Sequence, residues 1–349
     1  MISLCAHRVQ VHLLRYICSG TPAQVQSSFD HAMRKAALLY NPDSGGSQQR
    51  RRELESALAV LRDGGVEAEL VPTESRDHGG DETRRAIDSG CDTIFACGGD
   101  GTIHNIAQIL VNSPTALAIL PMGTANALAH DIGLPRGVVA AAKAALRCTA
   151  CRVALGRVTY ADLQGNPGAR YFVVAAGIGV DAHLFYKLHS GTKQRMGMAA
   201  YYAKAWNLWF TYAMPRFVAE YVETGSTVLK RAEITELLAV RIRNFGGVVQ
   251  ELAPGASLDR DDNRLVLCRS ASRLTYLAYV TRGLLRARWT IPRVDLVHST
   301  RVSCQYLTSS AAPQEQGKIY IEADGELLGT LPAEITAVPD ALTLLAPPR

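Results

Sequence analysis

No stretch of this 349-residue sequence is apolar over the roughly 18 residues that a membrane-spanning helix needs. The sequence also has no convincing signal peptide, so we expect a cytoplasmic protein whose thiols stay reduced. Aromatic residues make up only 7% of the chain, and no segment interleaves basic and aromatic residues as nucleic-acid-binding modules do. Nucleic acid is therefore not an expected partner. The net charge of +5 is modest, and it fits an anionic ligand, an anionic membrane surface or a solvated basic face.

The sequence has eight cysteines but no pattern typical of a metal site. Cys148 and Cys151 have C-x-x-C spacing, yet neither a second such pair nor a histidine partner accompanies them. Several cysteines lie in apolar runs, where a free thiol behaves as a small hydrophobic side chain. We therefore expect structural or incidental cysteines and no metal or redox centre among them.

The length of the chain predicts two domains, because it exceeds what one ordinary core accommodates. Residues 35–150 alternate apolar runs with helical patterns, which predicts an α/β domain with a doubly wound parallel sheet. The expected strands are Ala36–Tyr40, Glu67–Val71, Thr93–Ala96 and Ala116–Leu120, and the expected helices are Gln48–Arg62, Asp81–Ile87 and Ile103–Leu110. Residues 1–34 precede this pattern and are interpreted as an N-terminal extension that is disordered or lies upstream of the true start.

The pattern changes near Cys151, where alternation of apolar and polar residues predicts antiparallel strands. The expected strands are Arg152–Tyr160, Tyr171–Ala176, Arg216–Val222, Leu237–Asn244, Arg264–Cys268, Val302–Tyr306, Lys318–Glu322 and Ala341–Leu345. Helices are expected at Met196–Tyr212, which is rich in aromatics, and from Ser272 to about Arg288. Residues 151–349 are thus predicted to form a mostly-β sandwich or open barrel. The aromatic helix packs on this domain or contacts lipid, and the cleft between the domains is the expected active site.

Two glycine-rich turns carry the strongest chemical signal. Gly98-Gly99-Asp100-Gly101-Thr102 and the segment Pro121–Asn126 each follow a predicted buried strand, and each is expected to open a helix. Glycine lets the backbone approach a ligand closely, and N–H groups at a helix start attract anions. Two such turns at the ends of neighbouring strands predict a nucleotide phosphate site. Asp100 lies where a magnesium ion or an attacking hydroxyl group could meet the phosphate.

Four motifs together resemble the diacylglycerol kinase catalytic family, which includes bacterial soluble lipid kinases, sphingosine kinases and ceramide kinases. They are the segment Asn41–Gly46 (N-P-D-S-G-G), Gly98–Thr102, Pro121–Asn126 and Asp324-Gly325-Glu326, in the family's order. The resemblance runs from about Lys35 to the C-terminus. It implies the two-domain fold of that family and of NAD kinases, with ATP and Mg²⁺ as cofactors. It also implies a lipid-alcohol substrate such as diacylglycerol. The protein would reach this substrate by binding peripherally to the inner face of the membrane.

The resemblance also implies roles for individual residues. Glu326 matches the usual proton acceptor, although in some relatives the aspartate that matches Asp100 has this role. The implied nucleotide contacts are Asn41, Pro42, Ser44, Gly45, Thr73, Gly98, Gly99, Asp100, Gly101, Thr102, Gly123, Thr124 and Asn126. Asp262, with Asp259 and Arg264 nearby, falls in a stretch that resembles the family's structural magnesium site, which is formed partly by backbone carbonyls.

This sequence departs from the family where an Asn-Glu pair usually follows the first glycine turn. His104 and Asn105 occupy those positions here, and Asn105 cannot act as an acid, a base or a strong metal ligand. His104 is interpreted as a surface residue of the helix, with a metal or phosphate contact as the alternative. In the magnesium stretch, Asn263 replaces the usual glycine.

Three functions remain open from the sequence. The first is an ATP-dependent lipid kinase, in which Asp100 and Glu326 meet at the cleft because phosphoryl transfer needs positioning, charge neutralisation and a proton acceptor. The second is a kinase of a soluble substrate, as in NAD kinases, and the third is a nucleotide- or lipid-binding regulator that has lost catalysis. Asp324-Gly325 alone is also a strong hairpin-turn signal. An exposed edge strand of the β-rich domain could pair two copies of the chain.

Overall fold

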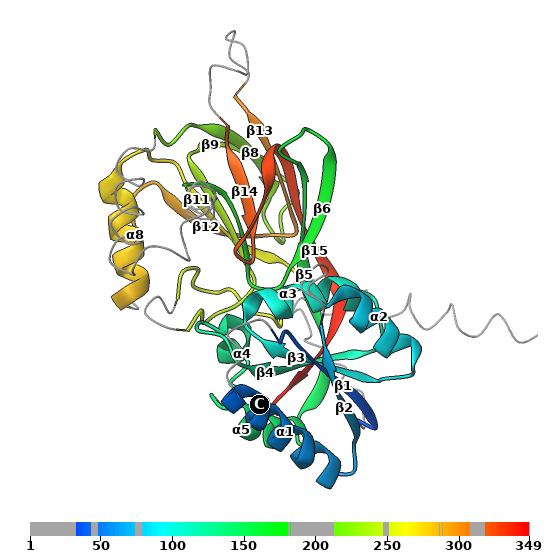
Figure 1. Cartoon of the computed structure of the whole chain (residues 1–349). Coiled ribbons are helices and arrows are strands. Elements are labelled where there is room, and N and C mark those ends of the chain that lie inside the picture. Colours follow the sequence, from blue (N-terminus) through cyan, green and yellow to red (C-terminus); the bar gives the residue numbers. More distant parts are fainter. Residues whose placement is uncertain are drawn as a thin grey trace, which may run out of the picture.

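The computed structural model describes residues 33–42, 48–73, 79–180, 182, 213–246, 251–285, 287, 289–307 and 318–348. Figure 1 shows an α/β part at the bottom and a strand-rich part above it, which confirms the predicted fold class. Ser44, Gly45, the predicted helix Met196–Tyr212 and nearly all of the N-terminal extension lie outside the described residues.

A four-stranded parallel arrangement forms the first part. Its strands are β1 (Lys35–Tyr40), β2 (Glu67–Pro72), β3 (Thr93–Gly98) and β4 (Ala116–Pro121), in the spatial order β4-β3-β1-β2. Its helices are α1 (Gln48–Asp63), α2 (Gly80–Asp88), α3 (Asp100–Leu110), α4 (Ala127–Asp131) and α5 (Val138–Ala145). The apolar runs predicted these strands because a parallel sheet is covered on both faces.

Helices cover both faces of this sheet, as a doubly wound fold requires. Leu54 and Leu61 of α1 share a core with Ala141 of α5 and with alternate strand residues such as Leu38. Ile103 and Ile106 of α3 pack on the other face, in the core that contains Leu39. The side-chain alternation of a strand therefore divides one short sheet between two cores.

The second part consists mainly of antiparallel strands. They are β5 (Thr149–Ala161), β6 (Pro167–Phe172), β7 (Ala175–Gly179), β8 (Phe217–Val222), β9 (Leu229–Ile234), β10 (Glu236–Val240), β11 (Asn263–Cys268), β12 (Val294–Ser299), β13 (Arg301–Tyr306), β14 (Tyr320–Ala323) and β15 (Glu326–Ala346). One helix, α8 (Arg273–Leu285), lies on the outside of these strands (Figure 1). A separate core contains Phe172, Phe217 and Ile321.

Several details of this part differ from the sequence-based expectation. The expected strand Tyr171–Ala176 is two strands, because the chain bends at Val173 and Val174. The strands β9 and β12 were not expected. In β9, Lys230 and Arg231 are exposed, so the apolar signal of a buried strand is weak.

The last strand, β15, is longer than expected and passes through both parts. It begins at Glu326 and pairs with β14, β13 and β5, and its end lies parallel to β4 through the pair Thr343–Ala116. Residues 341–346 therefore extend the sheet of the first part. A domain boundary at residue 150 stays a prediction. Of the helices that the structure describes, none combines the length and the apolar character needed to cross a bilayer.

Candidate active site

The two glycine turns lie against each other at the carboxyl ends of β3 and β4. Gly98 pairs with Pro121, and the N–H of Met122 donates to the Gly98 carbonyl at 2.9 Å. A Cβ atom on Gly123 would lie 2.5 Å from the Cα atom of Gly99, a distance that no side chain tolerates. Glycine is required here because the two backbones touch. The turns converge as the sequence predicted.

Asp100 links the two glycine turns by hydrogen bonds. It is the first residue of α3, and its carboxylate accepts hydrogen bonds from the N–H groups of Asn126 (3.0 Å) and Ala127 (2.7 Å). Asn126 has a positive φ of 50° and closes its own turn through two hydrogen bonds to the backbone of Gly123. Asp100 and Asn126 thus fix the backbone around Thr124.

A polar cavity of about 450 Å³ lies on one side of these turns. It gathers Asn41 and Pro42, which follow β1, with Gly98, Gly99, Thr102, Gly123 and Thr124 from the two turns. Arg50 and Arg51 of α1 also line it. Guanidinium groups and free backbone N–H groups bind phosphate oxygens, so the cavity suits a polyphosphate. The two arginines were not expected as site residues from the sequence.

Thr73 and Gly101 do not line this cavity. The buried hydroxyl group of Thr73 donates to the carbonyl of Tyr40 at 3.3 Å, and Tyr40 is the nearer residue to the cavity. Gly101 is exposed in the first turn of α3. Asp100 and Asn126 do not line this cavity either. The nucleotide contacts of all the implied residues, including Ser44 and Gly45 outside the described residues, stay predictions.

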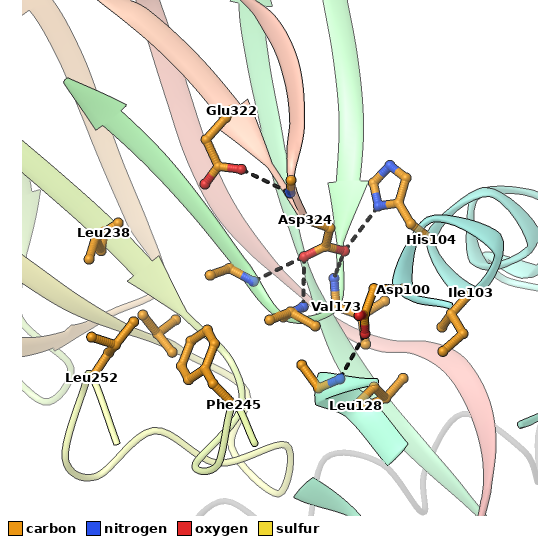
Figure 2. Close-up of a pocket in the computed structure, with 15 residues that line it drawn as sticks. Asp100, Ile103, His104, Leu128, Val173, Leu238, Phe245, Leu252, Glu322 and Asp324 are labelled. Carbon is orange, nitrogen blue, oxygen red and sulfur yellow. Dashed lines mark hydrogen bonds and ion pairs between the residues drawn. The ribbon is translucent and has the colours of Figure 1, made fainter. Parts of the chain in front are cut away.

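An apolar cavity of about 280 Å³ lies on the other side of Asp100. Figure 2 shows its wall, which includes Ile103 and Leu128 from the first part and Leu238, Phe245 and Leu252 from the second. Asp100, His104, Glu322 and Asp324 contribute its polar atoms. Asp100 lines the apolar cavity and the preceding Gly99 lines the polar one, so the two cavities meet at this peptide.

Asp324 lies in the tight turn between β14 and β15 and binds four donors. Its carboxylate accepts the N–H groups of Val173 (2.8 Å), Val174 (2.9 Å) and Ala175 (3.0 Å), as well as His104 Nδ1 (3.0 Å; Figure 2). Asp324 and Gly325 both have positive φ, as a two-residue hairpin turn requires. The segment is thus a hairpin turn and part of the candidate site at once.

Glu326 follows this turn and faces two side chains. Its Oε2 atom lies 3.1 Å from the guanidinium of Arg170 and 3.6 Å from His104 Nε2. Arg170 also donates to Asn105 at 3.1 Å. His104 lies one helical turn beyond Asp100, so the two predicted carboxylates, Asp100 and Glu326, come from different parts of the fold and flank one buried side chain.

The structure corrects the expectation that His104 is a surface residue. Its side chain is only 1% exposed and contacts residues far away in the sequence. Helical periodicity places His104 on a face of α3, but it cannot show that the β14–β15 turn covers that face. Arg170 and Asp324 were likewise not identified individually.

The stretch around Asp262 does not fit the expected magnesium ion. Both carboxylate oxygens of Asp262 accept hydrogen bonds from Arg260 (2.7 and 2.6 Å), and His298 (3.0 Å) and Thr224 (2.8 Å) also bind them. Asp259 accepts the Ser257 hydroxyl, and Arg264 donates to the Pro254 carbonyl. Within the described ranges, no three His, Cys, Asp or Glu side chains are grouped as a metal site.

A guanidinium group already supplies the cation in this stretch. Arg241 is fully buried and donates to the carbonyl oxygens of Asp262, Arg260 (2.7 Å) and Ala154 (2.9 Å). Burial lowers the pKa of Arg241 to about 10, so it stays charged at neutral pH. Burial alone would raise the pKa of Asp262, but hydrogen bonds from His298, Arg260 and Thr224 hold it well below its usual value. Arg241 and Asp262 are thus held in a buried network of protein donors and acceptors, which argues against a divalent ion bound to the Asp262 carboxylate.

Replacing Arg241 with methionine is expected to lower the free energy of unfolding by about 3–5 kcal/mol, the usual cost of breaking a buried ionic network from one side. Three carbonyl groups would lose their donor, and denaturant unfolding measures the change. Arg243→Met is the matched control, since Arg243 is 49% exposed and lies 3.9 Å from Asp259. We expect EDTA to leave wild-type stability unchanged. A melting temperature that falls with EDTA and recovers with magnesium would contradict this interpretation.

The cysteines of the described residues are free thiols, Cys148 and Cys151 included. Burial, with a smaller contribution from Cys151, raises the pKa of Cys148 to about 11. A thiol with a raised pKa is a poor nucleophile and a poor metal ligand at neutral pH. The structural or incidental role of these cysteines stays a prediction, which the raised pKa supports.

Comparisons with known proteins find diacylglycerol kinases over most of the chain. Residues 35–158 match the family model described as the diacylglycerol kinase catalytic domain. The chain is 28% identical over 309 residues to a diacylglycerol kinase of Bacillus subtilis (strain 168), covering 86% of this chain and 93% of that protein. It is 26% identical over 319 residues to one of Staphylococcus aureus (strain bovine RF122 / ET3-1), covering 90% and 93%. A crystal structure of a diacylglycerol kinase from Bacillus anthracis str. Sterne shares the fold, with a TM-score of 0.65 at 20% identity, over 90% of this chain and 98% of that one.

The fold, the converging glycine turns and these relatives define a class, the phosphotransferases that act on an alcohol group. Within that class, the chain is similar to the diacylglycerol kinases, whose catalytic-domain model matches residues 35–158.

Proposed function

We propose that this protein transfers the γ-phosphate of ATP to the hydroxyl group of a membrane lipid alcohol such as diacylglycerol. The observation that carries the proposal is the meeting of two unlike cavities at Gly99 and Asp100. The polar cavity suits the triphosphate and the apolar cavity suits an acyl chain. A hydroxyl group at the boundary between them would face the terminal phosphate.

The residues divide the chemistry between them. Phosphoryl transfer depends mainly on positioning and on neutralising charge. The glycine turns and the arginines of α1 would hold the triphosphate, and magnesium would enter as part of the Mg·ATP substrate. Asp100 holds two backbone N–H groups, whereas Glu326 lies beside His104 with one cationic partner, Arg170. We therefore assign proton acceptance to Glu326 and positioning of the turns to Asp100.

The two alternatives are separated by one assay. The purified protein is incubated with radiolabelled ATP and vesicles made from a total lipid extract, and the phosphorylated product is identified by mass spectrometry. A parallel reaction contains NAD in place of lipid. A labelled lipid supports the proposal. Label on NAD alone would favour the soluble-substrate kinase, and tight ATP binding without any product would favour the regulator.

Replacing Phe245 with serine tests the apolar cavity. Phe245 lines it from the second part (Figure 2), so we expect kcat/KM for a long-chain diacylglycerol to fall about tenfold, or roughly 1.4 kcal/mol of lost apolar contact. Phe245→Leu keeps an apolar side chain and should retain most of the activity. The KM for ATP should stay unchanged in both variants. An equal loss with a short-chain, water-soluble diacylglycerol would argue against an acyl-chain site.

Helix α8 supports the proposal of peripheral contact with the inner face of the cytoplasmic membrane. Leu274 is 76% exposed, Leu285 is 65% exposed, and Trp289 beyond the helix is 48% exposed. Apolar side chains on one helix that faces solvent are typical of interfacial membrane binding. The helix also contacts the cavity wall, because Tyr279 and Arg282 donate to the carbonyl of Leu252. A homodimer formed through an edge strand remains part of the proposal.

A further inference from the structure

His104 is a buried histidine with one ring nitrogen bound and the other unused. Its Nδ1 atom lies 3.0 Å from Asp324, and none of the described residues gives its Nε2 atom a hydrogen bond. The ring also lines the apolar cavity that the lipid alcohol is proposed to enter (Figure 2). A buried polar atom without a hydrogen-bond partner lowers the stability of the fold, so the unpaired Nε2 atom calls for an explanation.

Asp324 determines which ring nitrogen carries the proton. Both oxygen atoms of the carboxylate already accept backbone N–H groups, so they act as acceptors. The hydrogen bond to His104 therefore needs a proton on Nδ1. In the neutral ring, Nε2 then carries a lone pair and is itself an acceptor.

The Nε2 atom faces a second acceptor across a short gap. Glu326 Oε2 lies 3.6 Å from it, slightly beyond hydrogen-bond distance. Two acceptor atoms at this distance cannot form a hydrogen bond with each other unless one of them takes up a proton. One added proton between His104 and Glu326 would therefore form a hydrogen bond that joins the two groups.

Several charged side chains surround the ring. Asp324 and Glu326 come from the β14–β15 hairpin, Glu322 lines the same cavity from β14, and Asp100 lies on α3 itself. Arg170 on β6 is the opposing cation, and it is paired with Glu326. An imidazolium between these carboxylates would be stabilised by Asp324, much as a carboxylate orients and stabilises the histidine of a catalytic triad.

We infer that His104 is the final acceptor of the proton that the lipid hydroxyl group loses, and that Asp324 is its positioning residue. In this step the substrate oxygen forms a bond to the γ-phosphorus as the bond to the β–γ bridging oxygen breaks, and ADP leaves with that electron pair. The hydroxyl proton passes to Glu326 and from its carboxyl group to His104 Nε2, and solvent later removes it. The inference rests on the proposed kinase activity.

His104→Asn tests the inference because its amide can still donate to Asp324 while the Nε2 atom is gone. We expect unchanged ATP binding, a melting temperature close to that of the wild type and a kcat about 100-fold lower, within the range for lost acid–base catalysis. The matched control is His298→Asn. His298 has the same pairing of Nδ1 with an aspartate, Asp262, at 3.0 Å, but it does not line the cavity. Its kcat should stay within twofold of wild type.

His104→Ala separates proton acceptance from mere packing. Removing the ring leaves room beside the cavity for added imidazole, which should restore part of kcat. With a series of substituted imidazoles, the restored rate should rise with the basicity of the base. Nitrogen-15 NMR of the free wild-type protein should show His104 protonated at Nδ1 and free at Nε2.

The outcomes are distinguishable. A wild-type protein that phosphorylates lipid, together with a fully active His104→Asn variant, overturns the inference and leaves the proposed function intact. Rescue that does not depend on basicity also overturns it, because a filler would act the same way. A wild-type protein with no kinase activity on any lipid alcohol would refute the proposed function and the inference with it.

Discussion

Glu326→Gln is expected to lower kcat by about 100-fold to 10,000-fold, the range for a lost general base. Glutamine has nearly the same shape and can still accept a hydrogen bond from Arg170, which lies 3.1 Å from Glu326. It cannot take a proton from the lipid hydroxyl group. The KM for ATP should hold steady, because Glu326 does not line the polar cavity. Steady-state kinetics with both substrates varied measures the two effects separately.

Glu334→Gln is the matched control for this prediction. Glu334 lies on the same strand and is paired with an arginine in the same way, with Arg301 Nε at 2.9 Å, and this pair is at the surface. Surface ion pairs contribute little to stability, so both variants should remain folded. Equal activity of Glu326→Gln and Glu334→Gln would place the proton acceptor elsewhere.

Asp100→Asn is expected to lower kcat about 100-fold and also to raise the KM for ATP. An asparagine at this position presents one oxygen and one NH₂ group to two backbone N–H donors, so one of the bonds to Asn126 and Ala127 is lost. The turn that carries Thr124 would then shift away from the polar cavity. The loss of precise electrostatic positioning typically has this magnitude. Isothermal titration with a non-hydrolysable ATP analogue measures the binding component.

Asp92→Asn is the matched control for Asp100. Asp92 lies at the opposite edge of the same sheet and also accepts two backbone N–H groups, those of Arg34 (2.9 Å) and Lys35 (3.2 Å). Its replacement should change stability without changing the KM for ATP. Asp100 and Glu326 are half-buried, so a small drop in melting temperature is expected for their variants. If Asp100→Asn unfolds the protein outright, the residue is structural.

Local signals explain why the first part of the fold could be predicted. Each strand of the parallel sheet is a short apolar run buried on both faces, and each glycine turn follows its strand directly. Because the carboxyl ends of parallel strands lie at one edge of a sheet, both glycine turns were expected at that edge, and the pairing of β3 with β4 brings Gly99 and Gly123 together. The hairpin at Asp324 was likewise visible as a turn signal.

The contacts that complete the site were not predictable in the same way. His104 and Asp324 are separated by 220 positions, and Arg170 and Glu326 by 156. No periodicity links residues so far apart, because the pairing of β7, β14 and β15 decides which of them meet. The same holds for Arg241, whose three carbonyl partners are known only once the chain has folded. A charged residue in a strand pattern is assigned to the surface from the sequence, because the buried groups that pair with it cannot be identified before the fold is known.

The path of β15 ties the catalytic turn to the sheet of the first part. The strand starts at Glu326, and its pairing with β5 is interrupted between Val338 and Leu342, where Asp340 has a φ of 48°. Beyond this bulge, Leu344 lies beside Leu117 of β4. Any movement of the two parts toward each other around a bound lipid would have to bend β5 and β15 at this interruption. Leu344 and Leu345 near the end of this strand are 1% and 2% exposed, so a deletion that removes them would destabilise the core of the first part.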